Sequence, residues 1–293
     1  MEQRIHVGVG GWTFEPWRNN FYPAGLPHAK ELHYASRQLT AVEVNGTFYS
    51  TFQPSTFAKW RDETPEGFVF ALKAHRFTTH RRELASAGEG IERFVGSGIA
   101  ELGDKLGPIL WQLMPTTPFR ADDLEQFLRL LPREVQGRPL RHVLDVRHPS
   151  FACEEYLELL ARHGCTTVYT DSDKFPAIPH ARGELAYLRL MRSESACPTG
   201  YTPEAIAPWV RGAREWVALD AGNEAFVFFI SAAKERNPAA AMEFLRQLRE
   251  GGELDRIPTA PAITSRSPPP KPAAPAPLHS SARAARRRHP RSR

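Results

Sequence analysis

The chain has few cysteines, and their spacing excludes two structural classes. Its three cysteines, Cys153, Cys165 and Cys197, are odd in number, far apart and without a CxxC pair. This spacing fits neither a disulfide framework nor a zinc site, and it predicts reduced thiols in a cytoplasmic protein. No apolar run approaches the ~20 residues that a membrane-spanning helix needs. The first residues enter a strand pattern at once, so we expect no signal peptide.

Several enzyme motifs are also missing from the sequence. No Gly-x-Gly-x-x-Gly follows a predicted strand, which argues against a dinucleotide-binding sheet. There is no G-x-S-x-G motif, and no cysteine falls at the carboxyl end of a predicted strand, so a serine or cysteine nucleophile has no support. His75 and His148 lack a metal-ligand spacing such as HxxxH. The sequence therefore identifies no cofactor and no metal site.

Acidic residues are absent from the end of the chain. Residues 257–293 carry eight basic residues and no acid, and subtracting these from the overall +5 leaves −3 for residues 1–256. The composition of residues 253–293, rich in Pro, Ala and Arg, predicts a disordered tail. We favour a dispensable solvated extension over a nucleic-acid-binding arm, so any contact with nucleic acid is expected through this tail alone.

Strand patterns alternate with helical patterns along the rest of the chain. The predicted strands cover residues 4–11, 41–49, 68–75, 107–113, the first part of 140–151, 166–170, 184–191 and 225–231. The predicted helices cover residues 30–39, 56–63, 90–105, 121–131, 154–163, 202–219 and 237–249. The segment after the sixth strand is rich in Pro and Ala and has little helical character.

This alternation predicts the fold class. Strands separated by helices imply parallel pairing and right-handed crossovers. Eight strands over ~250 residues match a single (β/α)₈ TIM-type barrel, here residues 1–252, better than an open doubly wound sheet.

Polar side chains gather at the carboxyl ends of the predicted strands, where the active site of such a barrel lies. The carboxylates are candidates for acid/base catalysis: Glu43, Asp145 and Asp171. The other side chains are candidates for substrate binding: Trp12, Asn45, Lys73, Gln112, Arg147, His148 and Arg189. Most come from different strands, so the barrel brings charges of both signs to one mouth.

Each candidate also has a purely structural interpretation. Glu43 with Lys73, and Arg147 with Asp171, are possible internal ion pairs. Because burying an ion pair adds little net stability, we favour a ligand site for the cluster as a whole. The three carboxylates could hold a hard divalent cation, but the neighbouring lysine and arginines would repel it. Trp12 is suited either to stacking on a ligand or to packing within its loop.

Five ordered motifs carry a resemblance to a known family. VGVGGWTFEPWRNNFYP, VEVNGTFY, TPEGFVFALKAHRFTTH, KLGPILWQLMP and LDVRHPSF resemble the domain-of-unknown-function-72 (YecE-like) family, over roughly Ile5 to Leu248. The resemblance implies a TIM-type barrel and gives no reaction. Departures from the family pattern are Gly46 in place of Ser or Thr, Asp145 in place of Glu, Phe151 in place of Trp, and Ser231-Ala232 in place of an Asn pair.

The leading hypothesis is an enzyme that acts on a small, polar, anionic molecule at the carboxyl-end mouth of the barrel. The alternatives are a non-catalytic protein that binds a metabolite in the same pocket, and a nucleic-acid-associated protein that acts through its basic tail. Because Lys73, Arg147 and Arg189 would repel one another at one mouth, we expect sulfate or phosphate to bind among them.

Overall fold

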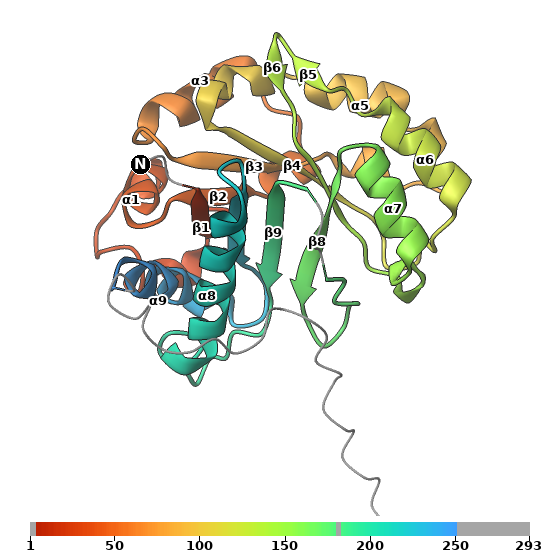
Figure 1. Ribbon diagram of the computed structural model, residues 1–293. Coiled ribbons are helices and arrows are strands. Elements are labelled where there is room, and N and C mark those ends of the chain that lie inside the picture. The colour runs from red at the N-terminus through yellow and green to blue at the C-terminus, as the bar shows by residue number, and fades with distance from the viewer. Residues whose placement is uncertain (1–3, 180–182, 251–293) are drawn as a thin grey trace, which may run out of the picture. The chain divides into compact units, whose positions relative to one another are not determined.

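Eight parallel strands close into a barrel in the computed structural model (Figure 1). The structure describes residues 4–179 and 183–250, so the predicted tail and the boundary at residue 252 lie outside the described residues. The barrel strands are β1 (Ile5–Gly10), β2 (Ala41–Val44), β3 (Val69–Lys73), β4 (Leu106–Gln112), β7 (His142–Asp145), β8 (Thr166–Asp171), β9 (Leu185–Leu190) and β10 (Glu224–Phe229). The predicted (β/α)₈ barrel is confirmed.

The strands follow one another around the ring in chain order, and the first pairs with the last. Each barrel strand pairs in parallel with its two neighbours, and β1 closes the ring on β10 with Ile5 opposite Ala225. Every carboxyl end therefore lies at the same mouth of the barrel. This arrangement brings side chains from distant parts of the chain together there.

Apolar side chains, from alanine to phenylalanine in size, fill the inside of the barrel. Successive residues of a strand point to opposite faces, so one alternate set from each strand faces the axis. The buried apolar members of the inner set are Ala41, Val69, Ala71, Leu110, Val143, Val168, Leu185, Tyr187, Phe226, Phe228 and Ile230. The inside is thus a packed core, and its polar members lie nearer the carboxyl ends.

Helices cover the outside of the barrel and complete two further apolar cores. These helices are α1 (Glu31–Gln38), α3 (Pro54–Glu63), α5 (Gly88–Val95), α6 (Ala121–Leu130), α7 (Glu154–Arg162), α8 (Pro203–Leu219) and α9 (Asn237–Glu250). Among the described residues between β8 and β9 there is no helix, as the Pro- and Ala-rich composition predicted. Within the described part of the chain, no helix has the length and apolar character to span a membrane.

Two predicted elements are wrong in extent. The strand predicted over residues 41–49 ends at Val44, and a short helix α2 (Gly46–Tyr49) follows because Asn45 turns into the helical region. The helix predicted over residues 90–105 is broken by Gly98, whose φ of 106° interrupts helical backbone, and the 3₁₀ segment from Ile99 to Lys105 that follows is kinked at Gly103. Glycine adopts such a φ without steric cost.

The sequence patterns also missed short elements in the loops. A two-stranded hairpin joins β5 (Glu134–Val135) to β6 (Arg138–Pro139) through Gln136 and Gly137, both with positive φ. A one-turn helix α4 (Arg76–Thr79) follows β3. Neither element is long enough to produce a periodic sequence signal.

The close approach of β1 and β2 predicts a strong effect for one glycine. A Cβ at Gly8 would lie 1.9 Å from the carbonyl oxygen of Ala41, whereas for a Cβ at Gly88, at the start of α5, the nearest atom beyond its chain neighbours and its own helix backbone would be Cδ2 of Leu130 at 3.7 Å. Gly8→Ala should therefore lower the free energy of unfolding by at least about 2 kcal/mol in urea denaturation, since backbone must move. Gly88→Ala, the control, should change it by less than about 1 kcal/mol. Equal effects would contradict the register of β1 on β2.

Candidate functional site

A buried arginine joins two buried carboxylates inside the barrel near its carboxyl end. The Nε and Nη2 of Arg189 on β9 donate to the carboxylate of Glu43 on β2, at 3.1 and 3.0 Å. Its Nη1 donates to Oδ2 of Asp145 on β7 at 2.6 Å. Glu43 and Asp145 have no exposed surface, and Arg189 is 3 % exposed. One guanidinium therefore ties three strands together across the barrel.

Three more side chains complete the hydrogen bonds of the two carboxylates. The hydroxyl of Tyr187 donates to Oε2 of Glu43 at 2.8 Å. Asp145 accepts from the amide of Gln112 at 2.6 Å, and from Nε and Nη2 of Arg147 at 3.0 and 2.8 Å. The guanidinium of Arg147 also lies 4.0 Å from the ring centre of Phe175. We call the six hydrogen-bonded residues Glu43, Gln112, Asp145, Arg147, Tyr187 and Arg189 the mouth network.

The charges of the mouth network are strongly stabilised by one another. Burial alone would raise the pKa of Asp145, but the charges of Arg189 and Arg147 outweigh it and hold that pKa well below its usual range. Burial opposes the charge of Arg189, yet Glu43 and Asp145 raise its pKa above the ordinary value. Burial and the nearby charge of Glu43 raise the pKa of Tyr187 well above its usual value. Asp145 is therefore ionised and Tyr187 protonated at neutral pH.

Lys73, at the end of β3, lies beside the mouth network without joining it. Its side chain is 7 % exposed, and within the described residues its Nζ makes no hydrogen bond or ion pair. Its contact is with the ring of Phe48 on α2, whose centre lies 4.0 Å from Nζ. Burial, and next the charge of Arg189, lower the pKa of Lys73 to about 8. About a tenth of this amine is thus uncharged at pH 7.

Thr170 adds an unpaired hydroxyl to the inner face. It shares that face with Val168, two residues before it on β8, and its register partner on β9 is Arg189. Thr170 is 1 % exposed, and its Oγ1 has no hydrogen-bond partner among the described residues. Buried hydroxyls are usually hydrogen-bonded, so this group is suited to a bound molecule.

Asp171 lies apart from the mouth network. It follows Thr170 and shares the outward face of β8 with Tyr169, whose ring packs against Trp209 on α8. Its carboxylate pairs with Arg192, Oδ1 to Nε at 2.9 Å. Burial raises the pKa of Asp171, with Arg192 opposing it. The structure therefore brings Glu43 and Asp145 together and leaves the third predicted carboxylate outside.

Three of the predicted binding residues, Trp12, Asn45 and His148, are not part of the mouth network. Trp12 packs edge-on against Trp60, with ring centres 5.0 Å apart, in the layer between barrel and helices. Asn45 lies close to Gly10 above Glu43, and its amide donates to the Glu43 carbonyl at 3.4 Å. The Nδ1 of His148 accepts from the backbone N–H of Ser150 and caps the short 3₁₀ helix Pro149–Phe151. Asn45 thus lines the mouth, whereas Trp12 and His148 have structural partners.

The ion pairs considered from the sequence are replaced by others. Arg147 pairs with Asp145 instead of Asp171, and Glu43 pairs with Arg189 instead of Lys73. Sequence reasoning also missed Tyr187, Thr170, Phe48 and Phe175. Tyr187 stands two residues before Arg189 and could have been assigned to the same face. The two phenylalanines lie in segments whose conformation the sequence pattern did not predict.

No metal centre emerges from the geometry of these carboxylates. The described residues contain no group of three or more His, Cys, Asp or Glu side chains arranged to hold a metal ion. Glu43 and Asp145 instead direct their oxygens to arginine, tyrosine and glutamine donors. A site lined with hydrogen-bond donors is better suited to binding an anion than a metal ion.

The loop after β10, which lies at the same mouth, has an unusual backbone conformation. Ser231 and Ala232 both have positive φ, 60° and 47°. Asparagine adopts this conformation more readily than alanine or serine. The Asn pair expected here from the family pattern would therefore fit this backbone. In the present chain, Ser231 and Ala232 adopt the same conformation although it is less favourable for them.

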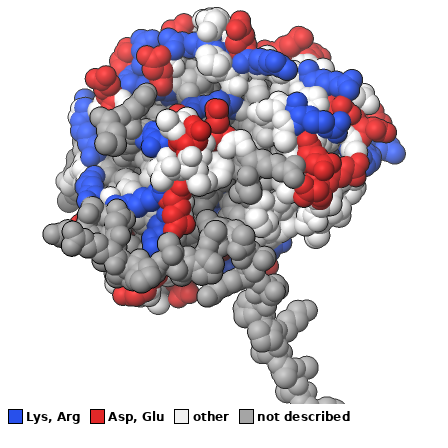
Figure 2. Space-filling view, viewed as in Figure 1, with Lys and Arg blue, Asp and Glu red and all other residues white. Residues whose placement is uncertain are grey.

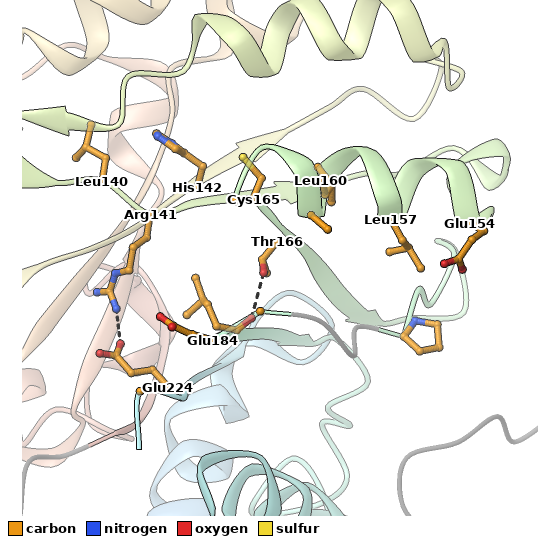
Figure 3. Close-up of a pocket in the computed structure, with 16 residues that line it drawn as sticks. Leu140, Arg141, His142, Glu154, Leu157, Leu160, Cys165, Thr166, Glu184 and Glu224 are labelled. Carbon is orange, nitrogen blue, oxygen red and sulfur yellow. Dashed lines mark hydrogen bonds and ion pairs between the residues drawn. The ribbon is translucent and has the colours of Figure 1, made fainter. Parts of the chain in front are cut away.

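A separate cavity lies at the opposite end of the barrel. It has a volume of about 630 Å³ and is lined by first residues of β7 to β10 and by one side of α7. Figure 3 shows Arg141 and Glu224 pointing toward each other across it, where they form an ion pair, while Leu157 and Leu160 line it from α7. Because its main charges already pair, and because it lies at the amino ends of the strands, we place the candidate site at the carboxyl-end mouth.

Comparison with known proteins gives the family. The model of a family described as "Protein of unknown function DUF72" matches residues 6–264. The chain belongs to the DUF72 family. Within it, the chain is 28 % identical to the UPF0759 protein YecE of Escherichia coli K12 over 215 residues, which cover 71 % of this chain and 73 % of YecE.

Solved structures of DUF72 proteins share the barrel. A DUF72 protein from Thermotoga maritima aligns with a TM-score of 0.66 at 24 % identity, covering 85 % of this chain and all of that one. A DUF72 protein from Enterococcus faecalis aligns with a TM-score of 0.62 at 17 % identity, also over 85 % of this chain and all of that one. At these identities the likeness supports the fold.

Removing Arg189 should destabilise this DUF72 protein strongly. Arg189→Met leaves two buried carboxylates without their shared cation, which should cost about 3–5 kcal/mol of unfolding free energy at neutral pH. The matched control is Arg192→Met, because Arg192 is half exposed and pairs with Asp171 and Asp173. That variant should lose less than about 1 kcal/mol. Urea denaturation of both variants measures the difference, and equal losses would contradict the buried network.

Proposed function

We propose that this DUF72 protein is an enzyme that acts on a small, polar, anionic molecule bound at the carboxyl-end mouth of the barrel. One observation carries the proposal: within the described residues, the buried hydroxyl of Thr170 has no hydrogen-bond partner, and Lys73, 7 % exposed, makes no hydrogen bond or ion pair, beside two carboxylates that are fully hydrogen-bonded. Buried polar groups without partners are costly, so a site that keeps them is suited to a ligand that satisfies them.

The charges at the mouth favour an anion. Three cationic side chains, Lys73, Arg147 and Arg189, surround the two carboxylates of Glu43 and Asp145. Arg189 uses three nitrogens on the carboxylates, whereas Nη1 of Arg147 makes no hydrogen bond within the described residues. A carboxylate or phosphate group would balance the remaining positive charge and accept hydrogen bonds from Arg147 and Thr170.

We propose a different assignment of the acid/base roles from the one expected from the sequence. Asp145 accepts four hydrogen bonds and has a strongly lowered pKa, so it is a poor proton donor or acceptor near neutral pH. Both oxygens of Glu43 are occupied by Arg189 and Tyr187. We assign both carboxylates to positioning, and we assign the reactive role, as proton acceptor or nucleophile, to Lys73, whose pKa of about 8 suits that role.

The alternatives have less support from the described residues. A non-catalytic binding protein would use the same cations but has no need for a lysine of lowered pKa. A nucleic-acid-binding barrel would need a continuous basic stripe. On the face shown in Figure 2, basic and acidic side chains of the described residues are interspersed, and acidic groups gather over α7. We also propose a cytoplasmic location, on the cysteine pattern alone.

Anion binding at the mouth is directly testable. Isothermal titration calorimetry with inorganic phosphate and sulfate should detect binding to the full-length protein. Arg147→Ala should weaken it by about 1.5–3 kcal/mol, the usual contribution of a hydrogen bond to a charged group. The matched control is Arg211→Ala, which removes an exposed arginine from α8. If both variants bind the anions as well as the unmodified protein, the mouth is not the site.

A further inference from the structure

Lys73 differs chemically from the other two cations at the mouth. The guanidinium groups of Arg147 and Arg189 stay charged and hold carboxylates, whereas an amine can lose its proton and become a nucleophile. The side chain of Lys73 is 7 % exposed, its Nζ lies 4.0 Å from the ring centre of Phe48, and no acceptor among the described residues binds it. An apolar contact and a neighbouring cation are the surroundings that activate lysine nucleophiles.

We propose that Lys73 forms an imine with the substrate, and that this substrate is a small aldehyde or ketone carrying a carboxylate or phosphate group. The inference rests on the proposed function, since it places the reacting carbonyl in the same mouth and names its chemical class. It also gives the chain a nucleophile, although its sequence has no serine or cysteine motif that would supply one.

The covalent step balances without an added oxidant or reductant. The lone pair of Nζ forms a bond to the carbonyl carbon, and one of the two amine protons passes to the carbonyl oxygen to give a carbinolamine. The second amine proton then passes to the hydroxyl, which leaves as water, and a C=N bond forms. One amine and one carbonyl thus give one imine and one water.

The neighbours of Lys73 fit this step. Glu43 and Asp145 are saturated by arginines, Tyr187 and Gln112, so neither holds the amine in an ion pair. Burial and Arg189 lower the pKa of Lys73 to about 8, which supplies free amine near neutral pH. The unused Nη1 of Arg147 and the hydroxyl of Thr170 remain to hold the anionic group of the substrate.

Borohydride trapping tests the imine. The full-length protein is incubated with glyoxylate, an anionic aldehyde, then reduced with borohydride, and the modified lysines are located by peptide mass spectrometry. We expect labelling of Lys73 at least about tenfold faster than labelling of exposed Lys59. Acetaldehyde, which has no anionic group, should label Lys73 more slowly. Lys73→Arg should abolish the fast label, whereas Lys30→Arg, the exposed control, should leave it unchanged.

Phosphate binding separates this inference from the proposed function. Lys73→Arg keeps a cation at the position, so it should still bind phosphate while losing the label. If glyoxylate labels Lys73 no faster than Lys59 although phosphate binding still depends on Arg147, the imine is wrong and the anion site stands. If no phosphate binds, the proposed function fails regardless of labelling. Equal rates with acetaldehyde and glyoxylate would overturn the anionic substrate class.

Discussion

The guanidinium of Arg189, shared between two buried carboxylates, is the interaction on which the mouth of this barrel depends. Its three nitrogens reach Glu43 on β2 and Asp145 on β7 from β9, across the inside of the ring. Each charge would be costly to bury alone, and only their mutual pairing, completed by Tyr187 and Gln112, makes their burial tolerable. The positions of three strand ends are thereby fixed relative to one another.

This pairing determines what the remaining groups can do. With both carboxylates fully engaged, Lys73 has no ion-pair partner within the described part of the chain, and burial and the charge of Arg189 destabilise the charged form of its amine. Arg147 pairs with Asp145 through Nε and Nη2, and its Nη1 makes no hydrogen bond to the residues that the structure describes. A rigid, satisfied network beside reactive, unsatisfied groups is the arrangement expected of a preorganised binding site.

Much of this arrangement was predictable, because strand alternation assigns side chains to faces. Glu43, Lys73, Asp145 and Arg189 stand at the carboxyl ends of strands with clear apolar alternation, so their convergence followed from the barrel itself. Asp171 was wrongly predicted to face the inside of the barrel. Successive residues of a strand point to opposite faces, so an assignment that is wrong by one residue puts a side chain on the wrong face. Thr170 occupies the inner face in its place.

Other features had no signal in a single sequence. The contact of Phe48 with Lys73 depends on the turn at Asn45 that ends β2 and starts α2, where the apolar pattern continued as if for a strand. The stacking of Phe175 on Arg147 comes from a loop without periodicity. The choice of partners among five charges depends on side-chain geometry, since several pairings satisfy the same strand order. Sequence reasoning thus predicted which residues meet and left open how they pair.

The pH dependence of stability tests the central claim, that Lys73 is a buried amine without a counterion. Its pKa in the folded protein is about 8, below the value of about 10.4 for an unfolded chain. Between these values the unfolded state binds more protons, so folding becomes more favourable as pH rises through this window.

The direct measurement is the unfolding free energy of the protein and of Lys73→Met from pH 7 to pH 10. The account predicts that the stability of the unmodified protein rises relative to the variant by about 2 kcal/mol across this range. A difference that stays constant with pH would show that Lys73 has an ordinary pKa, and would contradict the account.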